Sequence, residues 1–375
     1  MGIGYCPGMG ASTRRVRLVL LFGGRSTEHS ISCVSAGGVL RALDRSRYDV
    51  IPVGIDTEGR WAVLPDDSPA LAPVGTDLPV VDASTGLAVT LPPSPSAAPV
   101  VVHDPSAALR DLGPVDVVFP LLHGPFGEDG TIQGLLEMAG LPYVGSGVFA
   151  SAAAMDKQHM KSMLAAAGLP VGPYAVLRPG QALSEPDRER LGLPVFVKPA
   201  RGGSSIGISR VDAWADLDTA LKTARASDPK TLVEAAVVGR EIECGVLDSL
   251  DGSGPQASVP AEVTITSSAG FYDFEAKYLS DGAVFDVPAR LPGELTERVR
   301  ATAVAAFEAL DCAGLARVDM FVTPSGEIVL NEVNTMPGFT PMSMYPRMWA
   351  ASGIDYAALV DRLVQLALRD GAGLR

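Results

Sequence analysis

The first strongly apolar stretch of the chain, residues 16–22, restricts the possible folds more than any other segment. It has the length of a buried strand, and it runs directly into Gly23-Gly24. A segment with helical spacing of apolar residues follows, with Ser26 or Thr27 as the expected N-cap. A strand, a tight glycine turn and a helix in this order predict an α/β fold.

Two further apolar stretches, 50–55 and 115–122, predict buried strands, so the first part of the chain should be α/β with a largely parallel sheet. The Pro-, Ser- and Ala-rich stretch between them, 66–114, predicts no definite element. A helix is expected from residue 151 until Gly168, because a glycine and a following proline end helices.

The remaining chain alternates short strands with helices, which predicts two α+β units. Strands are expected at 193–199, 206–211, 231–237, 240–247, 259–266, 315–323 and 327–333, and helices at 213–226, 294–311 and 354–369. A length of 375 residues fits two or three domains. We divide the chain into a flexible extension (1–14), an N-terminal α/β domain (15–155), a central subdomain (156–247) and a C-terminal subdomain (248–375).

Net charge and cysteine usage exclude several classes of protein. The formal net charge of -13 disfavours wrapping of nucleic acid or of an anionic membrane. The four cysteines are widely spaced and have no histidine cluster nearby, so neither a disulfide framework nor a zinc site is expected. No stretch approaches the roughly 20 apolar residues that span a bilayer. We expect a cytoplasmic protein that binds neither nucleic acid nor membrane.

The segment 318–334, VDMFVTPSGEIVLNEVN, predicts two strands joined by a short turn. Glu332 and Asn334 point to the same face because strand side chains alternate, and Asp319 on the neighbouring strand can converge with them. Such oxygen ligands suit hard cations such as Mg²⁺. The alternative is a hairpin with solvent-facing polar groups, but the surrounding apolar residues indicate burial, where carboxylates need cations or hydrogen-bond donors.

The segment 193–209, LPVFVKPARGGSSIGIS, predicts a strand that carries Lys198, a loop rich in Gly and Ser, and a second strand. Glycines allow a close approach of the backbone, so the loop N–H groups with Ser204 and Ser205 can surround phosphate oxygens while Lys198 supplies positive charge. It is not a Walker loop, because the order of glycine and lysine differs and a strand follows. A plain hairpin turn is the alternative.

Two other segments can contribute to a site. In 232–247, backbone groups of Ala236 and Val237 can face an adenine edge and Glu241 can take ribose hydroxyls, although exposed acids on an edge hairpin would look the same. His123 follows a predicted strand at the sheet edge where α/β folds bind ligands. A lone histidine is otherwise an ordinary core or turn residue.

Taken together and in this order, the segments resemble the D-alanine–D-alanine ligase family of the ATP-grasp superfamily. The strings that carry the resemblance are FGGRSTEHSIS, LHGPFGEDGT, GSGVFASAAAMDK, VKPARGGSSIG, FYDFEAKYLSD, RVDMF and NEVNTMPGFT. The resemblance implies a three-domain ATP-grasp architecture of α/β and α+β units, in which the central and C-terminal subdomains clamp ATP. It also implies that two D-alanines are joined through an acyl phosphate, with ADP and phosphate as products, for peptidoglycan precursors of the cell wall. A homodimer is plausible by the same resemblance.

The resemblance assigns a role to each matching residue. For ATP it implies Lys157, Lys198, Ser205, Glu234, Ala236, Val237, Glu241 and Lys277. Asp319, Glu332 and Asn334 would hold two Mg²⁺ or Mn²⁺. For the substrates it implies Glu28, His123, Ser343 and Met344, and for catalysis Glu28, Ser204, Tyr278, Arg317, Gly338 and Ser343. Within these sets, Arg317 and the Gly338 N–H would stabilise an oxyanion, and Glu28, Ser204 and Tyr278 would form a hydrogen-bonded trio.

The chain departs from the family's usual sequence at three places, and three other functions compete with the one that the resemblance implies. Gly202 stands in a loop position that is usually polar, Met344 where Leu is frequent, and the chain has an N-terminal extension. The rivals are a ligase for D-lactate or another amino acid, an NAD-dependent oxidoreductase, and a catalytically inactive binding protein. Relatives that use D-lactate commonly carry Phe at the position of Tyr278, so the tyrosine favours an amine nucleophile. An NAD-dependent oxidoreductase would need a G-x-G-x-x-G turn after the first strand, and this sequence has none there. A catalytically inactive protein would have no physical reason to keep every charged ligand.

Overall fold

The computed structural model describes residues 14–72, 78–90, 101–103, 110–111, 113–265 and 283–373. Three β-sheets form in this part of the chain, in the strand orders β6-β5-β4-β3-β2-β1-β7, β10-β9-β11-β8 and β15-β14-β12-β16-β17. The whole of segment 271–282, whose aromatic residues with Lys277 and Tyr278 give it a composition that suits a lid over a site, lies outside the described residues.

The first sheet is built around β1 (Val16–Gly23), which runs parallel to β2 (Tyr48–Ile55) and β7 (Val117–Leu121). The parallel pairing of these three strands confirms the parallel sheet that the sequence predicted. An antiparallel extension adds to it, made of β3 (Trp61–Val63), β4 (Leu87–Thr90), β5 (Val101–His103) and β6 (Arg110–Asp111). Strands this short give no periodic pattern in the sequence, which is why the stretch 66–114 could not be assigned.

Helices cover both faces of the parallel part. Leu20 of β1 packs in one core with α1 (His29–Ala42) and α10 (Tyr356–Asp370), whereas Leu21 packs in another with α2 (Thr131–Ala139). Burial on both faces explains why β1 is apolar almost throughout. The last helix of the chain therefore returns to the first sheet.

The second sheet is antiparallel and contains β8 (Tyr174–Leu177), β9 (Val195–Pro199), β10 (Ser209–Val211) and β11 (Thr231–Ala235). The 3-10 turn η3 (Trp214–Asp216), α5 (Glu185–Leu191) and α6 (Leu217–Ser227) accompany it. Before it, α3 (Val148–Met155) and α4 (Lys157–Ala166) replace the single helix expected from residue 151. Asp156 separates them because its carboxylate accepts hydrogen bonds from the first N–H groups of α4.

The third sheet contains β12 (Arg240–Leu247), β13 (Gln256–Ala257), β14 (Ala261–Ile265), β15 (Ala283–Asp286), β16 (Leu315–Val322) and β17 (Ile328–Asn334). It packs against α8 (Gly293–Ala309) and α9 (Met344–Ala351). Because β12 pairs with β14 and β16, and not with the second sheet, we propose that the C-terminal subdomain begins near residue 240.

The expected N-cap of the first helix was wrong, and one helix was not predicted. Ser26 and Thr27 do not cap α1: the helix begins after Glu28, and the Ser26 hydroxyl accepts a hydrogen bond from the Glu28 N–H at 2.9 Å. Helix α9 was not foreseen, because glycine and prolines around residues 338–346 suggested a loop.

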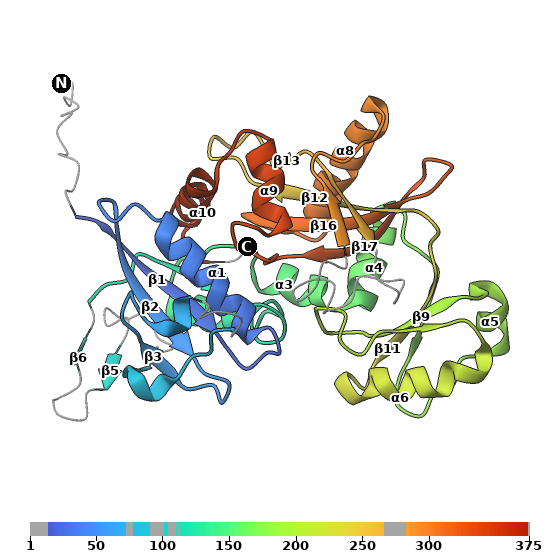
Figure 1. The fold of residues 1–375 in the computed structure, drawn as a ribbon, viewed down its shortest axis with the longest axis horizontal. Helices are drawn as coiled ribbons and strands as arrows, with labels where there is room; N and C mark the ends of the chain where they lie inside the picture. The colour runs from blue at the N-terminus through green and yellow to red at the C-terminus, as the bar shows by residue number, and fades with distance from the viewer. Residues whose placement is uncertain are drawn as a thin grey trace, which may run out of the picture.

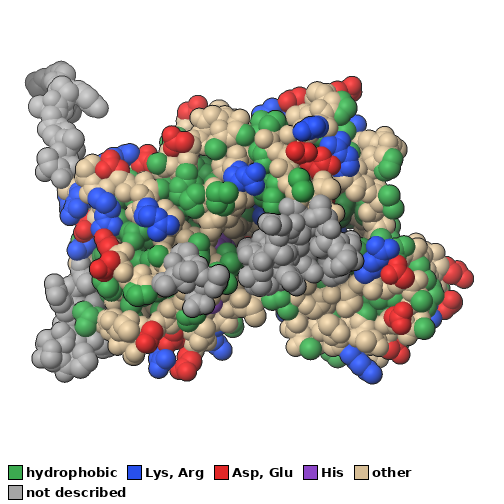
Figure 2. All heavy atoms as spheres, viewed as in Figure 1, with side chains coloured by type: hydrophobic (Ala, Val, Ile, Leu, Met, Phe, Trp, Pro, Cys, Tyr) green, Lys and Arg blue, Asp and Glu red, His purple; other side chains and the backbone are tan. Residues whose placement is uncertain are grey.

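The three sheets enclose a central space. In Figure 1, β1 and β2 lie at the left, β12, β16 and β17 at the upper right, and β9 and β11 at the lower right, with α3 and α4 between them. Figure 2 shows basic and acidic side chains interspersed over the visible face. Among the described residues, no helix combines the length and apolarity needed to cross a bilayer.

Candidate active site

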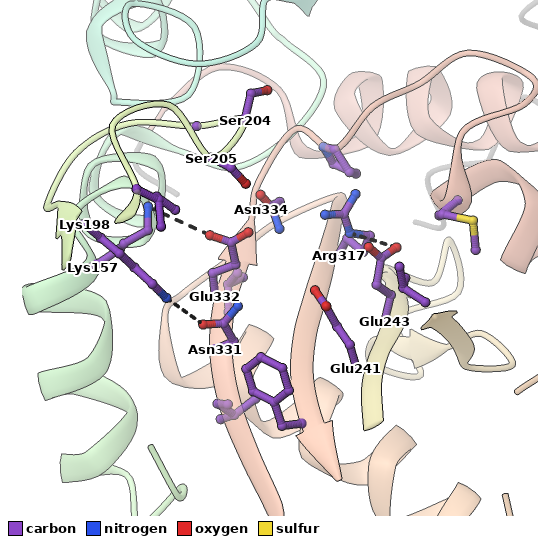
Figure 3. Close-up of a pocket in the computed structure, with 18 of the residues that line it drawn as sticks. Lys157, Lys198, Ser204, Ser205, Glu241, Glu243, Arg317, Asn331, Glu332 and Asn334 are labelled. Carbon is purple, nitrogen blue, oxygen red and sulfur yellow. Dashed lines mark hydrogen bonds and ion pairs between the residues drawn. The ribbon is translucent and has the colours of Figure 1, made fainter. Parts of the chain in front are cut away.

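A cavity of about 800 Å³ lies where the three sheets approach one another. Its wall includes Glu28 and His123 from the first sheet's loops, Lys198 and Glu234 from the second sheet, and Arg317 from the third. Segments far apart in the sequence therefore supply one site. Figure 3 shows a close-up of its charged part.

A buried carboxylate lies between two ammonium groups on one side of the cavity. Lys198 Nζ of β9 donates to Glu234 Oε2 of β11 at 2.8 Å, and Lys161 Nζ of α4 lies 3.5 Å from Glu234 Oε1. Burial would raise the pKa of Glu234, but Lys198 and Lys161 outweigh it and lower that pKa to about 2. Burial would lower the pKa of Lys198, yet Glu234 holds it above its ordinary value. Burial, which outweighs the charge of Glu234, lowers the pKa of Lys161. The Glu234 carboxylate and the Lys198 ammonium group are thus ionised near neutral pH.

Glu234 keeps hydrogen-bonding capacity for a ligand. Its Oε1 is buried and accepts no hydrogen bond from the described residues, although the Lys161 ion pair is near. Ala236 and Val237, which follow β11, line the same end of the cavity together with Glu241 of β12. The Ala236 N–H already donates to the Pro194 carbonyl at 3.0 Å, so the Ala236 carbonyl and the Val237 backbone are the groups that can face a ligand here. A buried carboxylate acceptor next to them suits the amino group and ring edge of a nucleobase.

The glycine-rich loop 202–207 folds over the cavity from β9. Lys157 Nζ donates to the Gly202 carbonyl at 2.9 Å and lies 3.8 Å from Glu332 Oε2. Ser204 and Ser205 have positive φ angles of 50° and 58°, which non-glycine residues rarely adopt. Such strain occurs most often at functional sites. In Figure 3 both serines lie on the loop; the Ser205 side chain points toward Asn334, whereas the Ser204 side chain points away from it.

Glu28 connects this loop to the first sheet. The Ser204 hydroxyl donates to Glu28 Oε1. Gly203 and Gly124 approach the same carboxylate so closely that an added Cβ on either would lie 2.7 Å from Glu28 Oε2. Glycine at both positions is what lets the buried carboxylate fit between two loops.

A row of charged and polar side chains covers one face of β12, β16 and β17. Arg317 and Asp319 are two residues apart on β16; Asn334 is directly opposite Arg317, and Glu332 is directly opposite Asp319. The guanidinium donates to both Asp319 oxygens at 2.8 and 2.7 Å, and Asn334 Nδ2 donates to Asp319 Oδ2 at 3.0 Å. Strand alternation thus produces the convergence that the sequence predicted.

The donor set on this face fits a hard divalent cation. Asp319, Glu332 and Asn334 offer carboxylate and amide oxygens, which Mg²⁺ prefers. Lys157, 3.8 Å from Glu332, and Lys198, 3.4 Å from Asn331 of the same strand, suit the phosphates that usually complete its shell. Among the described residues no group of three or more His, Cys, Asp and Glu side chains is arranged as a metal site.

His123 and Glu128 hold the turn that follows β17. His123 Nδ1 lies 3.1 Å from the Met336 carbonyl, and its Nε2 lies 3.2 Å from Ser35 Oγ. Because a carbonyl only accepts, Nδ1 carries the proton and Nε2 accepts from the hydroxyl. Burial lowers the pKa of His123, so the ring is neutral. Burial, and next the charge of Glu28, raise the pKa of Glu128 to about 8, although the Gly124 and Met336 N–H groups donate to it.

The start of α9 forms the remaining wall. Ser343 is its N-cap residue and Met344 its first residue, and both line the cavity with Gly338. Ser343 Oγ lies 2.8 Å from Thr340 Oγ1 and accepts from the Thr340 N–H at 3.1 Å. The unpaired N–H groups of a helix start suit a carboxylate.

The cavity wall contains nearly all of the predicted site residues that the structure describes. Asp319 lies just beneath the wall, where it is paired with Arg317. Four further residues line the cavity and were not predicted from the sequence: Lys161, Glu128, Glu243 and Asn331. The spacing of Lys157 and Lys161, one helical turn apart, was a usable signal for one of them.

Comparisons with known proteins agree with this geometry. The family model "D-ala D-ala ligase N-terminus" matches residues 17–146, and "D-ala D-ala ligase C-terminus" matches residues 163–365. The chain is 70% identical to the D-alanine–D-alanine ligase of Frankia casuarinae, over 98% of this chain and all of that protein. It is 57% identical to that of Mycobacterium avium, over 97% of this chain and all of that protein.

Solved structures show the same fold. The structure of the D-alanine–D-alanine ligase from Coxiella burnetii superposes with a TM-score of 0.81 at 35% identity, covering 95% of this chain and 94% of that one. The VanG D-Ala:D-Ser ligase from Enterococcus faecalis superposes with a TM-score of 0.81 at 34% identity, covering 94% of this chain and all of that one. With both family models, full-length relatives and the ATP-grasp fold in agreement, the chain belongs to the D-alanine–D-alanine ligase family.

Proposed function

We propose that the protein joins two D-alanines to D-alanyl-D-alanine at the expense of ATP, and so supplies a precursor of peptidoglycan. The observation that carries the proposal is the combination of side chains in one cavity. Lysines of the second sheet and its helix lie next to the acidic face of β16 and β17, and Glu28 joins the glycine-rich loop to the first sheet. Lysines fit phosphates, the acidic face fits cations, and Glu28 fits an ammonium group.

The reaction has two steps. A carboxylate oxygen of the first D-alanine attacks the γ-phosphorus of ATP, ADP leaves, and an acyl phosphate results. The amino nitrogen of the second D-alanine then attacks the carbonyl carbon, phosphate leaves, and the nitrogen loses a proton. The first step turns an unreactive carboxylate into an acyl group with a good leaving group. Water must be kept out in between, because it would hydrolyse the acyl phosphate.

The second and third sheets would bind ATP. Glu234 Oε1, Ala236 and Val237 would bind the adenine, and Glu241 the ribose hydroxyls. Lys157, Lys198, Ser205 and the loop N–H groups would bind the phosphates, with Lys277 at the γ-phosphate. Asp319, Glu332 and Asn334 would hold two Mg²⁺ or Mn²⁺, which supply neutralisation of phosphate charge during transfer.

The substrates would lie between the first and third sheets. Glu28 would hold the ammonium group of the first D-alanine, near His123. Ser343 and Met344 at the start of α9 would receive the carboxylate of the second. Arg317 and the Gly338 N–H would stabilise the oxyanion of the tetrahedral intermediate, and donors of this kind contribute about 100- to 1,000-fold to rate in acyl transfer. Glu28, Ser204 and Tyr278 would connect the first sheet, the glycine-rich loop and the lid.

The test is phosphate release from ATP and Mg²⁺ with and without D-alanine, with the products analysed for dipeptide. Phosphate that depends on D-alanine and matches D-alanyl-D-alanine one to one supports the proposal. Phosphate release that D-alanine does not stimulate contradicts it and directs the search to other amino and hydroxy acids. A homodimer and a cytoplasmic location remain predictions.

A second candidate function is ligation of D-alanine to a different second substrate. It is favoured by the similarity to a D-Ala:D-Ser ligase, and by Met344 at the second-substrate end of the cavity, where Leu is frequent in the family. Competition of D-alanine with D-serine and with D-lactate at several pH values separates the two functions.

A further inference from the structure

Glu243 is a buried carboxylate in the cavity wall to which the proposed function gives no task. It lies on β12, directly opposite Asp319 on β16, and only 2% of its surface is exposed. Like charges directly opposite each other destabilise a sheet, and a buried carboxylate needs a partner. A nearby positive charge must therefore offset the repulsion between Glu243 and Asp319.

Arg317 is the cation that lies between the two carboxylates. Its Nε is 3.3 Å from Glu243 Oε2 on one side, while Nε and Nη2 donate to Asp319 at 2.8 and 2.7 Å on the other. Figure 3 shows Glu243 and Arg317 joined on one side of the face, with Asn334 and Glu332 on the other. Asp319 lies on the central strand β16, between Glu243 of β12 on one side and Glu332 of β17 on the other. Arg317 pairs with Glu243 on the β12 side, and the expected oxygen ligands lie on the β17 side.

In the proposed function, Asp319 binds a divalent cation, although in this structure it is paired with Arg317. Both of its oxygens accept from Arg317, and one of them also accepts from Asn334. The same oxygens would have to turn to a divalent cation together with Glu332 and Asn334. These three hydrogen bonds take most of the roughly four lone-pair sites of the carboxylate. A dication bound to the same oxygens competes for their charge, so cation binding weakens the pairing of Arg317 with Asp319.

We infer that Glu243 is a positioning residue that holds the Arg317 guanidinium toward the reacting carbonyl when the cation takes Asp319. Glu243 lies on the far side of Asp319 from Glu332 and Asn334, so it stays with the arginine when Asp319 turns. Its burial keeps the ion pair out of bulk water, where it would be weak. The catalytic role of Arg317 in this inference rests on the proposed function. The pairing of Arg317 with Glu243 when a cation binds Asp319 does not depend on it.

The first test is structural and needs no turnover. Crystal structures of the wild-type protein, and of Glu243→Gln, are determined with Mn²⁺ and a non-hydrolysable ATP analogue. We expect Asp319 to bind Mn²⁺ and Arg317 to keep its contact with Glu243, and we expect the guanidinium to shift or become disordered in Glu243→Gln. The inference is overturned if Glu243 itself binds Mn²⁺, if Arg317 leaves Glu243, or if the guanidinium is unchanged in the variant.

The second test separates the two chemical steps. Positional isotope exchange in labelled ATP with D-alanine reports formation of the acyl phosphate, and dipeptide formation reports the attack that follows. Residues that orient a functional group through a hydrogen bond typically contribute about 10- to 100-fold. We expect Glu243→Gln to slow dipeptide formation by this factor, with isotope exchange, KM for ATP and Mn²⁺ affinity changed less than about threefold, and Glu243→Asp to recover part of the rate.

Asp361→Asn is the matched control, because it removes a carboxylate partner from Arg47 and Tyr48 on the surface of the first sheet, away from the cavity. It should leave both steps unchanged. An equal loss of isotope exchange and dipeptide formation in Glu243→Gln contradicts a role through Arg317. If the wild type makes no dipeptide from D-alanine, the proposed function fails, whereas the Mn²⁺ structures still decide the inference about Glu243.

Discussion

Lys198 and Glu234 lie on neighbouring antiparallel strands, and the lysine ammonium donates to the carboxylate at 2.8 Å inside the cavity wall. Lys161 reaches the other oxygen of the same carboxylate. One carboxylate therefore holds two buried lysine side chains together, and removing its charge leaves both without this counter-charge.

Glu234→Gln should lower the free energy of unfolding by about 3–5 kcal/mol at pH 7, the usual cost of breaking a buried ion pair. The effect should depend on pH with a definite sign. Because the pKa of Glu234 is lowered to about 2 from 4.5, its contribution is complete above the ordinary value and is lost as pH falls between the two. Urea unfolding at pH 7 and pH 3 measures this, and the difference between the two proteins should shrink at pH 3.

Glu185→Gln is the control for this prediction, because its carboxylate is exposed and lies 3.8 Å from Arg188. It should change stability by less than about 1 kcal/mol. A difference between Glu234→Gln and the wild type that stays constant from pH 7 to pH 3 would mean that the charge of Glu234 is not what stabilises the cluster.

Glu128→Gln should become more stable relative to the wild type as pH rises. The pKa of Glu128 is raised to about 8 from 4.5, so between these values the unfolded chain is ionised while the folded protein keeps the proton. Ionisation of the unfolded state then lowers the stability of the wild type as pH rises, and glutamine removes this loss. Melting temperatures of the ligand-free proteins at pH 5, 6.5 and 8 test it. Parallel curves across this range would show that Glu128 is ionised in the fold.

The convergence of Asp319, Glu332 and Asn334 and the position of Lys198 could be predicted from the sequence because their information is local. Asp319, Glu332 and Asn334 belong to one hairpin, and the two-residue period of strands determines which of them converge. Lys198 and the glycine-rich loop form one strand and turn in the same way.

Other parts of the site depend on contacts that no local pattern encodes. Lys161 shares a helix face with Lys157, but only the packing of β11 against this helix supplies its partner Glu234. Glu243 looks like one polar position in an apolar strand until β16 places Arg317 next to it. The sequence shows which face a side chain takes, but not which distant segment packs there. The antiparallel extension of the first sheet was missed for another reason, because strands of two to four residues are too short for a periodic pattern.

Glu332→Ala should abolish dipeptide formation with Mg²⁺, because a carboxylate next to the transferring phosphate would be lost. Glu327→Ala, an exposed residue before the same strand, should retain full activity. Initial rates over a range of Mg²⁺ and Mn²⁺ concentrations measure both variants. Near-normal turnover by Glu332→Ala at ordinary Mg²⁺ concentrations would remove Glu332 from the ligand set.

Tyr278→Phe should shift the second substrate toward D-lactate, most clearly at lower pH, where the amino group of D-alanine is protonated and a poorer nucleophile. The expectation rests on the sequence alone, since Tyr278 lies outside the described residues. The measurement is the ratio of ester to dipeptide formed from a mixture of D-alanine and D-lactate. An unchanged ratio from pH 6 to pH 8 would exclude Tyr278 from this choice.

Ser204 offers a way to separate a hydrogen bond from backbone strain. Its hydroxyl donates to Glu28, and its φ of 50° is one that glycine adopts freely and alanine does not. A hydrogen bond to a charged group typically contributes about 1.5–3 kcal/mol, or roughly tenfold to more than 100-fold in an equilibrium. If the hydroxyl is what matters, Ser204→Ala and Ser204→Gly should both raise the KM for the first D-alanine by about tenfold or more. If the backbone conformation is what matters, only Ser204→Ala should be impaired, and the Ser204–Glu28 bond would have no part in substrate binding.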